Sequence, residues 1–188
     1  HPVPLTMSVA ICTHDRPDSL LRCIDSVLAQ TRLPHELIVV DDGQLSEETR
    51  RTFADRCAAA KVRWIYLCKH PPGLPASRNL AVSRTTGDIL QFLDDDVELH
   101  PDFFHHILRL YELDGEGVLA GADGVLIDPP SAAARTFEVV YRLAGFWALR
   151  PKNVRQRPLP PALRDKRWAV PTHLLAGACM SFRRSALA

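Results

Sequence analysis

Long apolar runs and paired cysteines are missing from this sequence. No apolar run approaches the ~20 residues that a membrane-spanning helix requires, so no transmembrane segment is predicted. The five cysteines are scattered and form no CxxC pair, which favours reduced thiols and a cytoplasmic location. Residues 1–6 lack the basic and then apolar pattern of a signal peptide, and we expect them to be an appended segment without a function of its own.

Glycine is absent where two classes of nucleotide-binding protein need it. The segment CTHDRPDSL, residues 12–20, follows the first apolar run and contains no glycine. A dinucleotide-binding dehydrogenase has a GxGxxG motif at this point, and a nucleotidyltransferase has a glycine-rich, basic phosphate loop. The dehydrogenase is therefore excluded, and the nucleotidyltransferase is kept only as an alternative.

Acidic residues are almost absent from the last part of the chain. Residues 150–188 contain nine Lys and Arg and one acid, Asp165, a formal charge of +8 that leaves −7 on residues 1–149. Prolines interrupt residues 150–171, which predicts a mobile basic loop. The excess charge suits either a solvated surface or a phosphate-rich partner, such as a lipid-linked acceptor or an anionic membrane surface.

The sequence does contain a regular alternation of short apolar strands with amphipathic helices. Strands are predicted at residues 7–13, 36–42, 62–67 and 88–96, and helices at 17–30, 47–60, 74–87 and 101–111. This alternation specifies an α/β fold with a mostly parallel sheet and helices on both faces. Residues 118–127 and 172–182 suggest further strands, and 136–149 either a packed helix or a partner-binding surface.

Three consecutive aspartates, Asp94, Asp95 and Asp96, follow the fourth predicted strand. Two unit charges ~4 Å apart repel by about 4 kcal/mol at the effective dielectric of a protein surface, so the cluster must be solvated, protonated or neutralised by a cation. Such carboxylates can hold a divalent cation while a nucleotide diphosphate completes its coordination. A solvated turn that caps the next helix is the alternative.

A second acidic pair, Asp41 and Asp42, ends the second predicted strand. A carboxylate at this position can accept hydrogen bonds from a nucleobase or a sugar hydroxyl. The sequence DDG is also a good turn on its own. Because the carboxyl ends of parallel strands form one edge of a sheet, this pair and residues 13–16 are expected to lie near the three aspartates.

Five segments in order resemble the inverting, nucleotide-sugar-dependent glycosyltransferases of family 2. They are SVAICTHDRP, LxxCIDSVLAQT, ELIVVDDG, GLPASRNLAVSRTTGDILQFLDDD and LAGACMSFRRSAL, and together they extend from about Met7 to Leu187. The resemblance implies the GT-A fold, a Rossmann-like sheet that binds an activated sugar. Residues 1–188 are accordingly expected to form one nucleotide-sugar-binding domain.

The resemblance also implies roles for individual residues. Nucleotide contacts are expected from Thr13, Arg16, Asp41, Asp42, Arg78, Asp94 and Asp95, and Mg²⁺ or Mn²⁺ is expected on Asp96 and Asp94, with Asp96 as the direct ligand. The triplet matches the DxD motif of the family. His14 stands where the family commonly has an aromatic residue, and Ala178-Cys179 where an asparagine is common.

The implied reaction needs a general base, and the sequence does not supply one at a matching position. In the family an acidic residue follows the segment that resembles LAGACMSFRRSAL, whereas Asp165 is the only acid after Glu138 here and precedes that segment. We therefore leave the catalytic base unassigned and expect the chain to be the donor-binding part of a longer enzyme. A nucleotide-binding domain without turnover is the alternative.

The expected activity is transfer of a sugar, with inversion, from a nucleotide diphosphate sugar to an acceptor hydroxyl. The resemblance suggests a uridine-linked donor, a saccharide or lipid-linked acceptor, and a place in polysaccharide or cell-envelope glycan synthesis. No nucleic-acid partner is expected. The predicted location is the cytoplasm, with association at the cytoplasmic face of a membrane left open.

Overall fold

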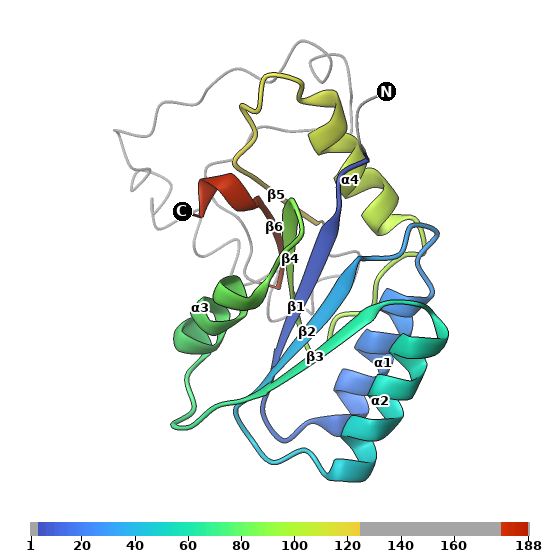
Figure 1. Cartoon of the computed structure of the whole chain (residues 1–188), viewed down its shortest axis with the longest axis vertical. Helices are drawn as coiled ribbons and strands as arrows, with labels where there is room; N and C mark the ends of the chain where they lie inside the picture. Colours follow the sequence, from blue (N-terminus) through green and yellow to red (C-terminus); the bar gives the residue numbers. More distant parts are fainter. Residues whose placement is uncertain (1–3, 125–177, 188) are drawn as a thin grey trace, which may run out of the picture.

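The computed structural model describes residues 4–124 and 178–187 (Figure 1). The described strands form one sheet in the order β3-β2-β1-β4-β6-β5. The strands are β1 (Met7–Thr13), β2 (Glu36–Asp41), β3 (Arg63–Cys68), β4 (Ile89–Asp94), β5 (Gly121–Asp123) and β6 (Cys179–Arg183). The helices are α1 (Pro17–Leu28), α2 (Glu47–Ala59), α3 (Leu74–Arg84), α4 (Phe103–Leu113) and the short 3₁₀ helix η2 (Arg184–Ala186).

This architecture confirms the predicted α/β fold. Strands β3, β2, β1 and β4 run parallel, and each helix from α1 to α3 connects two of them. Strand β6 is antiparallel to β4, and β5 is antiparallel to β6. The predictions for residues 136–149 and 150–171 lie outside the described residues, as do the start of the predicted strand 172–182 and the end of the predicted strand 118–127.

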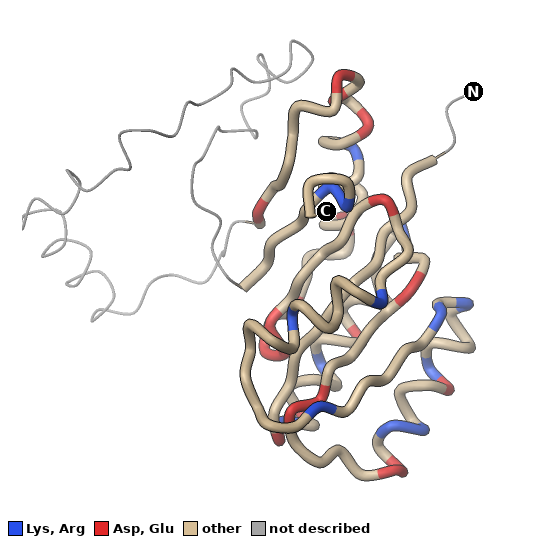
Figure 2. The backbone as a smooth tube through the Cα atoms, turned by 60° about the vertical axis from the view of Figure 1, so that its left-hand side comes forward, with Lys and Arg blue, Asp and Glu red and all other residues tan. Residues whose placement is uncertain are grey.

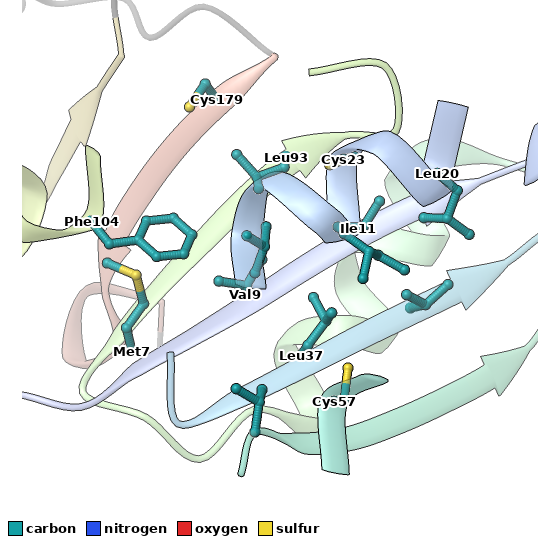
Figure 3. Close-up of a cluster of buried hydrophobic side chains, with 14 of the residues drawn as sticks. Met7, Val9, Ile11, Leu20, Cys23, Leu37, Cys57, Leu93, Phe104 and Cys179 are labelled. Carbon is teal, nitrogen blue, oxygen red and sulfur yellow. The ribbon is translucent and has the colours of Figure 1, made fainter. Parts of the chain in front are cut away.

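The core occupies both faces of the sheet. Val9 and Ile11 of β1 pack with α1, α2 and α4 on one face, whereas Ala10 packs with α3 on the other. Helix α1 buries a single stripe at helical spacing, consisting of Leu20, Cys23, Ile24 and Val27. Figure 3 shows part of this stripe against β1. Because β2 is buried on both faces, its sequence is a continuous apolar run rather than an alternating one.

Strand β6 is connected to the rest of the domain by a partly buried ion pair. Arg183 Nη2 donates to Asp114 Oδ2 at 3.0 Å, and Asp114 also accepts from the backbone N–H groups of Val118 and Leu119. At the other end of β6, the Asp94 N–H donates to the Ala178 carbonyl at 3.0 Å. The strand therefore ends beside the first of the three consecutive aspartates.

No helix in residues 4–124 or 178–187 is long and apolar enough to cross a bilayer.

Candidate functional site

A cavity of about 450 Å³ lies at the carboxyl ends of the parallel strands. Four segments form its wall: the end of β1 with the following loop, the loop after β2, the loop before α3, and the turn after β4. Six of the predicted site residues line it, namely Thr13, Arg16, Asp42, Asp94, Asp95 and Asp96. The topology thus brings together residues that are separated by up to about 80 positions in the sequence.

Two arginines accompany the three aspartates. Arg78 Nη2 donates to Asp94 Oδ1 at 3.2 Å, and Arg16 Nη1 lies 3.3 Å from Asp95 Oδ1 and 3.5 Å from Asp96 Oδ2. Acidic and basic segments also lie next to each other at the lower end of the molecule in Figure 2. Two guanidinium charges therefore offset part of the repulsion among three carboxylates, a solution that the sequence pattern alone does not reveal.

The middle aspartate is held inside the protein. Thr13 Oγ1 donates to Asp95 Oδ2 at 2.8 Å, and the Asp95 side chain is 8% exposed. Asp96 is different, because its side chain is 61% exposed and its Oδ2 lies 3.5 Å from Arg16 Nη1, at the long end of the hydrogen-bond range. Asp95 is therefore anchored by Thr13, while Asp96 presents its carboxylate to the cavity.

Asp94 carries unfavourable negative charge. Burial is the largest cause that raises the pKa of Asp94 above its ordinary value, and the neighbouring Asp96 and Asp95 add to the effect, against the opposing charge of Arg78. A group whose ionised form is disfavoured in this way gains from an additional cation nearby. The electrostatics of the turn after β4 thus suit a positively charged ligand.

The donor chemistry of the cavity fits Mg²⁺ or Mn²⁺. In the described part of the chain, no three His, Cys, Asp or Glu side chains come together as a ready-made metal site. Mg²⁺, however, is commonly held by one or two carboxylates together with substrate phosphates and water rather than by a complete protein cage. Asp96 and Asp94, both in the cavity wall, offer this kind of incomplete set of hard oxygen ligands.

Asp42 is a buried but cavity-lining carboxylate. Ser77 Oγ lies 2.7 and 2.8 Å from its two oxygens, Gly73 N donates at 2.9 Å, and Lys69 Nζ is 3.4 Å away. Burial alone would raise the pKa of Asp42, but these hydrogen bonds and the Lys69 charge outweigh it and hold the pKa below its ordinary value. Asp42 is thus an ionised acceptor facing the cavity.

Asp41 is placed differently from its neighbour. It is fully buried, and its carboxylate accepts hydrogen bonds from Gly43 N at 2.8 Å, Leu45 N at 2.9 Å and Tyr66 Oη at 2.6 Å. These contacts shape the turn after β2 and connect it to β3. Of the two acids that the sequence left open as nucleotide contacts, the structure places Asp42 in the cavity wall and Asp41 beneath it.

Arg78 lies outside the cavity lining and is brought to the site through Asp94. It projects from α3, and its guanidinium also lies 5.8 Å from the centre of the Phe92 ring. The segment GLPASRN, which singled out Arg78, supplies further site residues that the sequence reasoning did not assign. Gly73 and Leu74 line the cavity, and Ser77 binds Asp42.

A hydrogen bond to Asp15 joins the loops after β1 and β2. Asp15 has a φ of 53°, and its Oδ1 accepts from Gln44 N at 3.1 Å. A Cβ placed on Gly43 would lie 2.2 Å from the same oxygen, so only glycine permits this close approach. Asp15 therefore connects the loop that carries His14 to the loop that carries Asp42, and both of these residues line the cavity. The sequence did not indicate this role for Asp15.

Comparisons with known proteins agree with this arrangement. The family model described as "Glycosyl transferase family 2" matches residues 8–188. "O-antigen biosynthesis protein RfbC" of Myxococcus xanthus is 27% identical over 180 residues, which are 95% of this chain and 14% of that protein. "Glucosyl-dolichyl phosphate glucuronosyltransferase" of Haloferax volcanii is 30% identical over 119 residues, 62% of this chain and 37% of that protein.

Among solved structures, the chain is similar to the mannosyltransferase PcManGT from Pyrobaculum calidifontis, described in complex with GDP-Man and Mn²⁺. The TM-score is 0.63 at 17% identity, and the match covers 98% of this chain and 46% of that one. This likeness shows the fold. The chain spans 14% and 37% of the lengths of the two curated relatives.

Proposed function

The chain belongs to glycosyl transferase family 2, and on this premise we propose that the protein transfers a sugar from a nucleotide diphosphate sugar to an acceptor hydroxyl. The observation that carries the proposal is the cavity at the carboxyl ends of β1, β2 and β4, where an ionised Asp42 faces the arginine-paired triplet Asp94–Asp96. Such a site offers hydrogen-bond acceptors at one side and a charged diphosphate position at the other.

In this proposal different residues bind different parts of the nucleotide-sugar donor. Asp42 accepts hydrogen bonds from the base or ribose, for which its depressed pKa keeps it ionised. Thr13 positions Asp95, and Arg78 positions Asp94, so that the turn after β4 faces the ribose and diphosphate. Arg16 is the cavity-lining cation that can donate to phosphate oxygens.

Asp96 and Asp94 are the residues that would hold Mg²⁺ or Mn²⁺. When bound, the cation supplies Lewis-acid stabilisation of the negative charge that develops on the leaving diphosphate. The remaining site residues orient the donor and contribute no proton transfer in this scheme. The general base that inversion requires is proposed to come from residues outside those described, and residues 1–188 to form the donor-binding domain of a longer protein.

The finer assignments rest on the relatives. RfbC is named for O-antigen biosynthesis and the Haloferax enzyme for a glucosyl-dolichyl phosphate substrate, which supports a saccharide or lipid-linked acceptor and a role in glycan synthesis. The uridine-linked donor suggested by the sequence is proposed alongside a guanosine-linked one, because PcManGT is described with GDP-Man. A cytoplasmic location, at or away from a membrane surface, stays a prediction.

A thermal-shift titration tests the proposal. The melting temperature of the chain is followed with UDP, GDP, ADP and CDP, each with and without Mn²⁺ or Mg²⁺. A ligand that binds only the native state, at ~100 times its dissociation constant, adds about 2.7 kcal/mol of stability. We expect one nucleoside diphosphate to stabilise the chain, and the cation to increase its effect.

Asp96→Asn is expected to remove the contribution of the cation while leaving the fold intact, since Asp96 is exposed. Glu98→Gln is the matched control, because Glu98 is an exposed acid two positions away that pairs with Arg22 outside the cavity. If none of the four diphosphates shifts the melting temperature, with or without a cation, the donor-binding proposal is wrong. Release of nucleoside diphosphate from the matching sugar donor then separates a transferase from a domain that only binds.

A further inference from the structure

Arg16 holds the acids of the cavity in an unusual way. It is the residue before α1, its side chain is 59% exposed, and one nitrogen, Nη1, lies within 3.5 Å of both Asp95 and Asp96. A single donor shared between two carboxylates at 3.3 and 3.5 Å forms no bidentate pair, and the contact with Asp96 joins two exposed side chains, a kind of ion pair that contributes little to stability. The Arg16 contact is therefore weak and reversible.

The other contacts of the triplet are better anchored. Asp95 retains the Thr13 hydroxyl at 2.8 Å, and Asp94 retains Arg78, whose side chain is only 24% exposed. If Arg16 moved away, Asp95 would keep a hydrogen-bond donor and Asp96 would be left to the solvent or to a ligand. Arg16 is thus the more exposed of the two arginines, and a divalent cation on Asp96 would replace its charge beside the nearly buried Asp95.

We propose that Arg16 is a mobile counter-ion that couples divalent-cation binding to nucleotide binding. In this structure it pairs with Asp95 and Asp96; when Asp96 takes up a cation, the positively charged guanidinium is repelled and moves to the diphosphate that lies in the same cavity. This inference rests on the proposed function, because it presumes a nucleoside diphosphate and a divalent cation at Asp96.

The coupling has a direction that can be measured. Without nucleotide, a cation competes with Arg16 for Asp96 and binds weakly. With a nucleoside diphosphate present, Arg16 has a new anionic partner, so the competition is relieved and the cation binds more tightly. By linkage the cation strengthens nucleotide binding by the same factor, which we expect to be about fivefold or more.

The experiment measures Mn²⁺ affinity by electron paramagnetic resonance or calorimetry, alone and with saturating UDP or GDP, whichever stabilises the chain. In Arg16→Gln, Mn²⁺ alone is expected to bind about two- to fivefold more tightly, as the loss of a weak competing ion pair allows. The nucleotide is expected to bind more weakly in the same variant, and the coupling factor to fall at least twofold below the wild-type value, with the remainder due to direct contact between the cation and the diphosphate. Arg16→Lys keeps the charge and should retain part of the coupling.

Arg22→Gln is the matched control. It removes the same charge from α1, but Arg22 pairs with Glu98 and lies outside the cavity lining, so the coupling should be unchanged. Unaltered or weakened Mn²⁺ binding in Arg16→Gln, or an equal effect in Arg22→Gln, overturns the role of Arg16 while the donor-binding proposal stands. If the wild-type chain binds a nucleoside diphosphate equally well with and without Mn²⁺, the proposed cation site at Asp96 is wrong, and so is the proposed coupling.

Discussion

The hydroxyl of Ser77 lies 2.7 Å from one carboxylate oxygen of Asp42 and 2.8 Å from the other. Ser77 belongs to the first turns of α3 and Asp42 to the loop after β2, and both are buried. The contact therefore joins two walls of the cavity, together with the hydrogen bond that Gly73 N donates to Asp42.

Ser77→Ala is expected to destabilise the domain by about 1–3 kcal/mol at neutral pH, the usual cost of leaving a buried acceptor short of a donor. The pKa of Asp42 is depressed in the fold, so its contribution is present above the unfolded value of 3.8 and is lost as the pH falls through the folded value. The difference between variant and wild type should therefore shrink as the pH falls below 3.8. Urea unfolding at several pH values measures it.

Ser83→Ala is the control for this series, because Ser83 is an exposed residue of the same helix that donates to the Leu80 carbonyl. It should cost less than 1 kcal/mol and show no such pH dependence. An equal loss of stability in the two variants would contradict the role given to the Ser77–Asp42 pair.

Asp94→Asn is expected to raise the melting temperature of the nucleotide-free domain at pH 7. Burial and the neighbouring acids raise the pKa of Asp94, so ionisation costs stability as the pH rises from the unfolded value of 3.8 through the folded value. Asparagine resembles the neutral form and avoids this cost. The gain should vanish below pH 3.8, and nucleotide binding should be weakened at the same time, a trade between stability and function.

The control for Asp94 is Asp55→Asn, which changes an exposed acid on α2. Differential scanning calorimetry of both variants across the pH range should show a pH-dependent gain for residue 94 alone. A loss of stability in Asp94→Asn at neutral pH would indicate that the ion pair with Arg78 outweighs the repulsion.

Gly43→Ala is expected to disturb two loops of the cavity together. The new Cβ would meet Asp15 Oδ1 at 2.2 Å and the Asp15 backbone N at 2.9 Å, and overpacking of this kind costs about 1–3 kcal/mol. Because the displaced loop carries His14 and is bonded to residue 42, nucleotide affinity should fall with stability. Equilibrium unfolding and nucleotide titration measure the two effects.

A second change tests the cause. Asp15→Gly removes the clashing carboxylate and suits the positive φ of this position, so the double variant should regain part of the stability that Gly43→Ala loses. Gly115→Ala is the control, since nothing lies within 4 Å of a Cβ at that position. A double variant no better than Gly43→Ala would place the strain elsewhere.

The cysteines offer a chemical probe of the cavity. Cys12 lines the cavity, and burial raises the pKa of its thiol from 9.0 to about 11, which lowers the thiolate fraction by about 100-fold. Cys68 is exposed. A thiol reagent at pH 7 should therefore label Cys68 first, and a bound nucleoside diphosphate should slow the later labelling of Cys12 without changing that of Cys68.

Cys68→Ser identifies the fast phase in this experiment, and peptide mapping identifies the site of the slow one. Labelling of Cys12 at the same rate with and without saturating nucleotide would contradict a ligand in this cavity.

The secondary structure follows closely from local patterns. The predicted strand 7–13 is β1, Met7–Thr13. A continuous run of β-branched and apolar residues is typical of a strand that is buried on both faces in the middle of a parallel sheet. The predicted helix 17–30 ends two residues earlier, at Leu28. Gln30 instead uses its side chain to bind the Ser26 and His100 carbonyls and the Phe104 N–H, a tertiary connection between α1 and α4 that no local pattern indicates.

The site was predictable as a set of residue types but not as a set of contacts. Strand ends in a parallel sheet share one edge, so residues 13–16, 41–42 and 94–96 were expected together. Which of two adjacent acids faces the cavity depends on the turn that each one makes, and Asp41 and Asp42 differ in this respect. The arginine partners also depend on where α1 and α3 pack.

For this protein the sequence by itself determined the α/β alternation, the edge at which polar residues gather and the resemblance to a family, since each depends on local periodicity or on residue order. Only the tertiary structure decided that β6 runs antiparallel between β4 and β5, that Asp42 lines the cavity while Asp41 lies beneath it, and that Arg16 and Arg78 neutralise the acids after β4. The reason is physical: charge pairing and burial depend on distances between segments far apart in the chain, and the folded packing sets those distances.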